Sequence, residues 1–254
     1  MKKIIALVLA ALMLVAMVAC GTPEETTDAP DVTDAPDVTD APDTDAPAAD
    51  DVVVMTYAEY AAAELQTPVV IEAYVQATQS WWDNKITVYT QDKDGAYFIY
   101  ELACTQEDAA KLVPGTKIRV SGYKGAWAGE VEVIDGTFEF VENADTYIAE
   151  AIDATALLGT EELINYQNQL AIFKGMTVVE ISYKNGEPGD DIYVTLSKDG
   201  ANYDFCVERY LTGPETEVYA AVGALEAGDI VDVEGFIYWY EGVNTHITAV
   251  SAAE

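Results

Sequence analysis

Two blocks of sequence recur in the same order, and this repeat limits the folded part of the chain to two copies of one small, β-rich fold. Residues 86–96, ITVYTQDKDGA, recur as residues 192–201, IYVTLSKDGA. Residues 112–122, LVPGTKIRVSG, recur as residues 225–235, LEAGDIVDVEG. The Lys-Asp-Gly of the first block lies between alternating β-branched and aromatic runs. It predicts a hairpin turn, because Asp and Gly tolerate the positive φ of a tight turn.

The spacing of apolar residues predicts five strands in each copy. In the first copy they lie at residues 69–76, 85–91, 96–102, 117–123 and 131–140, and in the second at residues 170–181, 191–196, 202–207, 230–239 and 245–251. A capping box at residues 105–108, TQED, opens a helix through Leu112 in the first copy. A longer insert at residues 211–224 replaces it in the second. Three strands, a helix and two strands resemble the OB-fold, a five-stranded Greek-key barrel.

The predicted fold class is therefore mainly β, with two tandem five-stranded OB-like barrels and short helices. We assign residues 52–143 to the first OB-like domain and residues 144–254 to the second. Apolar residues near helical spacing also predict a helix before each barrel, at residues 56–65 and 153–169. Each helix is expected to pack on a barrel end or between the domains.

Residues 1–20, MKKIIALVLAALMLVAMVAC, resemble a bacterial lipoprotein signal peptide. The apolar run is shorter than the roughly 20 residues that span a bilayer, and Lys2 and Lys3 supply the positive flank of an export signal. Residues 17–20, MVAC, resemble a lipobox, in which Cys20 is lipidated and becomes the new N-terminus. An ordinary cleaved signal or an uncleaved anchor is the alternative.

Residues 21–51 repeat a Thr-Asp-Ala-Pro motif and contain no aromatic residue. A chain of this composition cannot bury a core, so we predict a disordered, extended, acidic stalk. The order of signal, acidic linker and barrels resembles bacterial lipoproteins with tandem OB-fold-like domains. That resemblance implies an exported protein, held to the cell membrane by its lipid and facing the extracellular or envelope side.

The balance of charge bears on the class of partner. The chain has 45 acidic and 12 basic side chains, a formal net charge of −33. Nucleic-acid affinity rests largely on cations that neutralise phosphates, so nucleic acid is not an expected partner. A weak basic strip in the first copy is the alternative, and its members are Lys85, Lys93, Lys117, Arg119 and Lys124.

Paired tryptophans lie in the loop between the first two predicted strands, which in OB-folds often forms one edge of the ligand groove. An exposed indole can stack on a sugar ring or a base, and neighbouring amides and carboxylates can bind hydroxyl groups. Packing of the indoles on the barrel end and on the preceding helix is the competing interpretation. The predicted ligand-binding residues are Trp81, Trp82, Trp127, Tyr89, Tyr97, Gln79, Asp83 and Asn84.

No pattern predicts a catalytic residue, a metal site or a cofactor. His246 is the only histidine, and G-x-S-x-G, HExxH and phosphate-binding glycine loops do not occur. Asp92 and Asp94 alternate as in a calcium loop but lack its bidentate Glu, so a hairpin turn explains them better. Cys104 and Cys206 lie in or beside apolar runs of different predicted domains, which favours buried free thiols over a disulfide.

These observations predict a lipid-anchored, surface-displayed binding or scaffold protein that is not an enzyme. The expected ligand is an oligosaccharide or another protein, bound in an aromatic groove. A nucleic-acid-binding OB-fold lipoprotein and a cell-envelope enzyme are the alternatives. Function lies in sites carried by a fold rather than in the fold itself, so the ligand must be argued from the groove.

Overall fold

The computed structural model describes residues 53–253 of the chain. The predicted signal peptide, the lipidation site Cys20 and the whole of the predicted stalk lie outside these residues. Over the described range, no helix is long and apolar enough to cross a membrane.

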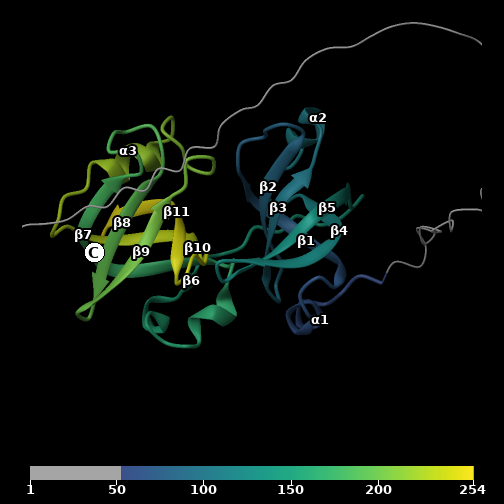
Figure 1. Cartoon of the computed structure of the whole chain (residues 1–254), viewed down its shortest axis with the longest axis horizontal. Coiled ribbons are helices and arrows are strands. Elements are labelled where there is room, and N and C mark those ends of the chain that lie inside the picture. The colour runs from purple at the N-terminus through teal and green to yellow at the C-terminus, as the bar shows by residue number, and fades with distance from the viewer. Residues whose placement is uncertain (1–52, 254) are drawn as a thin grey trace, which may run out of the picture. The chain divides into compact units, whose positions relative to one another are not determined.

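The first half of the described chain forms a closed five-stranded barrel in the order β1-β2-β3-β5-β4, with β4 returning to β1 (Figure 1). Strands β3 and β5 run parallel, and the other neighbours run antiparallel. A short helix separates β3 from β4, so the mainly β class and an OB-like barrel are confirmed. The elements are α1 (Tyr57–Ala62), β1 (Pro68–Thr78), β2 (Lys85–Gln91), β3 (Ala96–Ala103), α2 (Gln106–Ala109), β4 (Lys117–Trp127) and β5 (Glu130–Phe140).

The alternation of β1 shows why this sequence forms a barrel. Val69, Ile71, Ala73 and Val75 are at most 1% exposed, and the residues between them are half-buried. Successive side chains of a strand point to opposite faces, so this spacing sends the apolar set into the interior. There they pack on inward residues of the other strands, including Ile99, Leu102, Ile118 and Val120.

The second half repeats the same pairings among its last five strands. The order is β10-β11-β9-β8-β7-β6, and β10 also pairs with β7, while β9 and β11 run parallel. Two 3-10 turns and one helix complete this half. The elements are β6 (Ile152–Asp153), η1 (Thr155–Leu157), η2 (Leu163–Tyr166), β7 (Leu170–Tyr183), β8 (Ile192–Lys198), β9 (Ala201–Val207), α3 (Glu217–Gly223), β10 (Ile230–Phe236) and β11 (Asn244–Ala252).

The glycines of the second repeated block have a physical reason. Gly115 and Gly228 adopt φ values of 89° and 99°, which side chains other than glycine rarely tolerate. A Cβ at Gly122 would lie 2.7 Å from the carbonyl oxygen of Ile134, and one at Gly235 would meet the backbone of His246. The glycines of this repeat are therefore required by a turn before the fourth strand and by the close approach of the fifth strand to the fourth.

The predicted helix at residues 153–169 is wrong. Ile152 and Asp153 instead pair in parallel with β7, and the Asp153 carboxylate accepts hydrogen bonds from the Thr155 backbone and hydroxyl at 3.1 and 2.7 Å. Such local bonds compete with a helix. The helix predicted at residues 56–65 is present but ends at Ala62, and the insert at 211–224 contains α3.

A third apolar cluster joins the two halves, which belong to one compact unit. Tyr89 stacks on Phe236 with ring centroids 4.6 Å apart, and Phe98 contacts Tyr238 edge-on at 5.3 Å. The Tyr89 hydroxyl lies 2.6 Å from His246 Nδ1, and both groups are buried. Burial lowers the pKa of His246 to about 3, so its ring is neutral here.

Lys124 secures α1 against the first barrel. Its ammonium group donates to the carbonyl oxygens of Tyr60, Ala61 and Ala63 at 2.8 to 2.9 Å, at the C-terminal end of the helix. Only 6% of Lys124 is exposed. A cation at this end adds a donor for the carbonyls of the last turn and interacts favourably with the helix dipole.

We expect Lys124→Met to lower the free energy of unfolding by about 1–3 kcal/mol, because one buried and two part-buried carbonyls lose the ammonium donor. Urea unfolding followed by circular dichroism measures this loss. Lys111→Met is the matched control, because Lys111 forms ion pairs only with carboxylates of its own helix region at the surface, and its loss should change stability little. Equal losses in the two variants would contradict the assignment.

Candidate functional site

Three of the predicted ligand-binding residues lie around one cavity of about 670 Å³, which we call the tryptophan groove. Gln79, Trp81 and Trp82 line it from the first barrel. Tyr100 of β3 also lines it, and Arg209 and Tyr210 complete it from the second half of the chain. The groove is therefore a joint product of both halves rather than of the first copy alone.

Trp82 owes its exposure to a tight turn. Trp82 and Lys85 exchange backbone hydrogen bonds of 2.9 Å in both directions, with Asp83 and Asn84 between them at φ values of 46° and 61°. Asp and Asn tolerate this left-handed conformation better than most residues. Trp82, at the start of this turn, is 79% exposed.

Trp81 has a different role from its neighbour. Its indole Nε1 donates to the carbonyl oxygen of Cys104 at 2.8 Å, and its ring packs against the core of the first barrel. Cys104 and Cys206 are buried free cysteines, as predicted. Trp81 thus forms the floor of the groove, while Trp82 is the indole open to a ligand.

Tyr100 reaches the groove because the regular alternation of inward and outward side chains along β3 is interrupted. Tyr97, Phe98 and Ile99 are all buried, whereas Tyr100 and Glu101 are exposed. Glu101 has a φ of 46°, and the register of β2 against β3 shifts beside it. This is the geometry of a β-bulge, which re-aims a side chain. No feature of the alternation pattern indicates the bulge.

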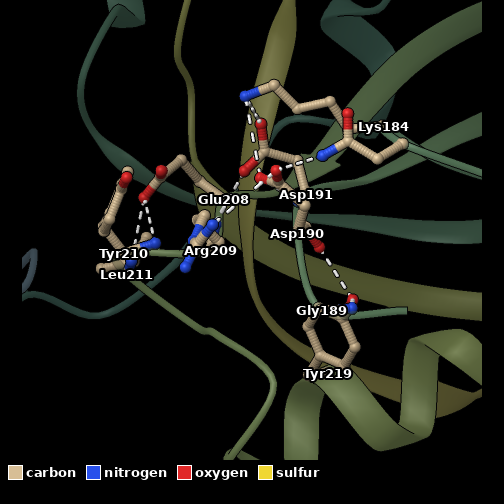
Figure 2. A network of polar contacts seen from close by, with 10 residues as sticks. Lys184, Gly189, Asp190, Asp191, Glu208, Arg209, Tyr210, Leu211 and Tyr219 are labelled. Atoms are coloured by element: carbon tan, nitrogen blue, oxygen red, sulfur yellow. Dashed lines mark hydrogen bonds and ion pairs between the residues drawn. The ribbon is translucent and has the colours of Figure 1, made fainter. Parts of the chain in front are cut away.

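A carboxylate network fixes Tyr210 and Arg209 at the edge of the groove (Figure 2). Glu208 Oε2 accepts from the backbone N–H groups of Tyr210 and Leu211 at 3.0 and 2.9 Å. Asp191 accepts from the backbone of Arg209 at 3.0 Å and from Lys184 Nζ at 2.8 Å. The Tyr210 carbonyl in turn accepts from the backbone of Ser80 at 2.8 Å, which links the network to the first barrel.

A second cavity of about 780 Å³, the inter-barrel pocket, adjoins the groove and shares Gln79 and Tyr100 with it. Trp127, the last residue of β4, lines this pocket and is 64% exposed. Tyr238 and Tyr240 line it from the second half, and Tyr238 stacks on His246 at 4.1 Å. The two cavities together present rings from both halves.

The remaining predicted residues need correction. Tyr89 and Tyr97 are each 1% exposed, so neither ring is open to a ligand. Tyr89 joins the two halves, and Tyr97 packs in the first barrel against Tyr57 and Tyr60. Asp83 and Asn84 form the turn and do not line either cavity. Conversely, the sequence analysis missed Tyr100, Tyr210 and Arg209.

The predicted basic strip does not form one surface. Lys117 and Arg119 both pair with Glu72, at 2.6 and 2.7 Å, and Lys124 is buried under α1. Only Lys85 of the five lines the groove, where it pairs with Glu101 at 2.7 Å. Asp92 accepts from the backbone of Asp94 and Gly95, so the predicted hairpin turn is present.

Three glutamates in or near the pocket are less acidic than usual. Burial raises the pKa of Glu132 and of Glu208 to about 7 and that of Glu130 to about 8. Among residues 53–253, no group of three or more His, Cys, Asp or Glu side chains is arranged to hold a metal ion.

Glu130 is fully buried where the halves meet. Its Oε2 accepts from the backbone of Trp239 at 2.9 Å, while its Oε1 and the Asn168 Oδ1 are both buried without a partner. The Asn168 amide lies beside the carboxyl group, and its Nδ2 donates to the Val131 carbonyl. Burial without a full set of partners disfavours the charged carboxylate, so the protonated form of Glu130 is favoured.

No protein-family model matches the chain, and no curated protein matches it. Solved structures do match. The Ifi202 HINa domain in complex with 20-base-pair double-stranded DNA is 9% identical with a TM-score of 0.36, covering 75% of this chain and 97% of that one. A murine DNA-binding protein bound to double-stranded DNA is 14% identical with a TM-score of 0.35, covering 74% and 96%. A Replication Protein A heterotrimer bound to single-stranded DNA is 12% identical with a TM-score of 0.29, covering 74% and 49%.

At this level the similarity concerns the arrangement of strands and does not identify binding residues. The prediction that nucleic acid is an unlikely partner is nevertheless not supported by these comparisons, because the matched structures are described in complex with DNA. The prediction rested on net charge, which is a sum over the whole chain, whereas a ligand meets local side chains. Lys85 and Arg209 both line the groove beside Trp82 and Tyr210.

Glu130→Gln should reduce the pH dependence of stability. The pKa of Glu130 is raised from 4.5 to about 8, so its contribution is full below pH 4.5 and is lost as pH rises through 8. Glu132 and Glu208 act in the same direction up to about pH 7. His246, with its lowered pKa, destabilises only as pH falls below 6.5 toward 3.

Between pH 6.5 and 9 we therefore expect the wild-type protein to lose at least about 2 kcal/mol of unfolding free energy, and Glu130→Gln to lose clearly less. Urea unfolding at several pH values measures both slopes. Glu142→Gln, which removes an exposed carboxylate, is the control and should follow the wild type. A slope for Glu130→Gln identical to that of the wild type would contradict the protonated carboxyl.

Proposed function

We propose that the two halves form a binding module, in which the tryptophan groove and the inter-barrel pocket together hold an oligosaccharide. The single observation that carries this proposal is the set of exposed rings around two adjoining cavities. Trp82, Tyr210 and Tyr100 line the groove, and Trp127 and Tyr240 line the pocket. These five side chains are between 44% and 79% exposed.

Ring faces of this kind fit the apolar faces of sugars, while nearby polar groups select hydroxyl positions. The groove supplies Gln79 and Glu101 for that purpose, and the pocket supplies Asn244. A neutral ligand avoids repulsion from the acidic chain. In this proposal the module binds its ligand and does not catalyse a reaction.

Single-stranded nucleic acid is the second candidate. Binding of single strands combines stacking rings with cations that follow the backbone. The guanidinium of Arg209 lies 5.0 Å from the ring centre of Tyr210, and Lys85 lines the same groove as Trp82. The two cations would bind phosphates, and the two rings would stack on bases.

We also propose that the module is lipid-anchored through Cys20 and displayed on the extracellular or envelope side of the cell membrane, with residues 21–51 as its spacer. Metabolic labelling of the expressing cell with a radioactive fatty acid tests this proposal. Label in the wild-type protein and none in Cys20→Ser would support it. An unlabelled wild-type protein would overturn it.

Trp82→Ala should weaken oligosaccharide binding about tenfold, because the most exposed ring of the groove is lost, and tenfold corresponds to about 1.4 kcal/mol. Intrinsic tryptophan fluorescence and calorimetry of the full chain, titrated with a β-1,4-linked glucose tetramer and an N-acetylglucosamine tetramer, measure the change. Tyr123→Ala is the matched control, since Tyr123 is an exposed ring that lines neither cavity.

A thymidine 12-mer titrated at 50 and 200 mM salt separates the two candidates. Phosphate contacts lose affinity steeply with salt, whereas neutral sugars do not. Salt-sensitive binding of the 12-mer that is lost in both Trp82→Ala and Arg209→Ala would replace the oligosaccharide proposal with the nucleic-acid one. Sugar binding that Trp82→Ala leaves unchanged would remove the groove as the binding site.

A further inference from the structure

Glu132 is a buried carboxyl group with no partner in the described part of the chain. It lies in β5, opposite Phe98 of β3 and Gly125 of β4. It is 8% exposed, lines the inter-barrel pocket, and makes no side-chain hydrogen bond or ion pair with any residue between 53 and 253. Placing a carboxylate in such a position costs free energy unless something pairs with it.

The other two carboxyl groups of the pocket are already engaged. Asp191 accepts from Lys184 Nζ and from the backbone of Arg209, and Glu208 accepts from two backbone N–H groups. Their role is to hold the chain around Tyr210, as Figure 2 shows. Glu132 alone among them is left for a ligand.

The surroundings of Glu132 suit an organic cation. Trp127, Tyr238 and Tyr240 line the same pocket, and aromatic faces attract ammonium groups. A metal ion would need several oxygen ligands, and the described residues hold no cluster that supplies three. His246 is neutral and already bonded to Tyr89, and Lys184 is paired with Asp191, so neither neutralises Glu132.

We propose that the inter-barrel pocket is a subsite for the free amino group of an amino sugar, with Glu132 as its ion-pair partner and the pocket's rings against the sugar. This proposal rests on the oligosaccharide function proposed above. Because Gln79 and Tyr100 line both cavities, one linear ligand can occupy the groove and place its amino sugar unit in the pocket.

The test compares two tetramers that differ only in acetylation, a glucosamine tetramer with protonated amines and an N-acetylglucosamine tetramer, by calorimetry with the full chain. We expect the glucosamine tetramer to bind at least tenfold more tightly. Glu132→Gln, which keeps the shape of the side chain, should abolish this preference. Glu142→Gln controls for the loss of one negative charge on an exposed side chain.

The outcomes separate the two proposals. Binding of the N-acetylated tetramer without a preference for the amine overturns the subsite but keeps the groove, and so does a preference that Glu132→Gln retains. Failure of both tetramers overturns the oligosaccharide function as well. If a lysine tetrapeptide binds more tightly than the glucosamine tetramer, the proposal that the amine belongs to a sugar is overturned. If Glu132→Gln does not fold, the absence of any preference for the glucosamine tetramer on the wild-type protein still overturns the subsite.

Discussion

The buried contact between Tyr89 and His246 is the interaction on which the binding surface depends. Gln79 donates to the Tyr89 hydroxyl at 3.3 Å, so this hydroxyl can give its own hydrogen to His246 Nδ1 at 2.6 Å. A neutral ring with its hydrogen on Nε2 fits this arrangement, and burial favours the neutral form. His246 in turn stacks on Tyr238, which lines the inter-barrel pocket. The contact that joins the halves therefore also positions a wall of the site.

Elsewhere on the binding surface, too, some groups hold the chain in place and others are exposed to a ligand. Polar groups with buried partners hold backbone in place, and the rings that remain open are free for a ligand. The Trp81 indole donates a hydrogen bond to the Cys104 carbonyl, which holds Trp81 in place beside Trp82. The Glu208 carboxylate accepts a hydrogen bond from the backbone of Tyr210 and so holds Tyr210 in place. Because the groove needs Trp82 from one half and Tyr210 from the other, a shift of the interface would separate the two rings. Binding and the stability of the interface are thus coupled.

Local patterns explain which features could be predicted from the sequence. Alternation in β1 and the turn residues at Asp92 and Gly95 depend on neighbours in the chain, and the structure has both the strand and the turn. The bulge at Glu101, which exposes Tyr100, and the approach of Tyr210 to Ser80 depend on partners far away in the sequence. No periodicity signals such contacts. The set of predicted ligand-binding residues therefore included the buried Tyr89 and Tyr97 and omitted the exposed Tyr100 and Tyr210.

Charge shows the same limit in energetic terms. A formal count assigns a full negative charge to every carboxyl group, yet Glu130, Glu132 and Glu208 have pKa values of about 7 to 8 and are partly protonated near neutral pH. Where the halves meet, the field is accordingly weaker than the net charge of −33 suggests. A ligand entering the pocket meets carboxyl groups that can gain or lose a proton in response to its own charge. A cation favours the ionised form and a neutral sugar the protonated form, so the charge of the pocket depends on the ligand it holds.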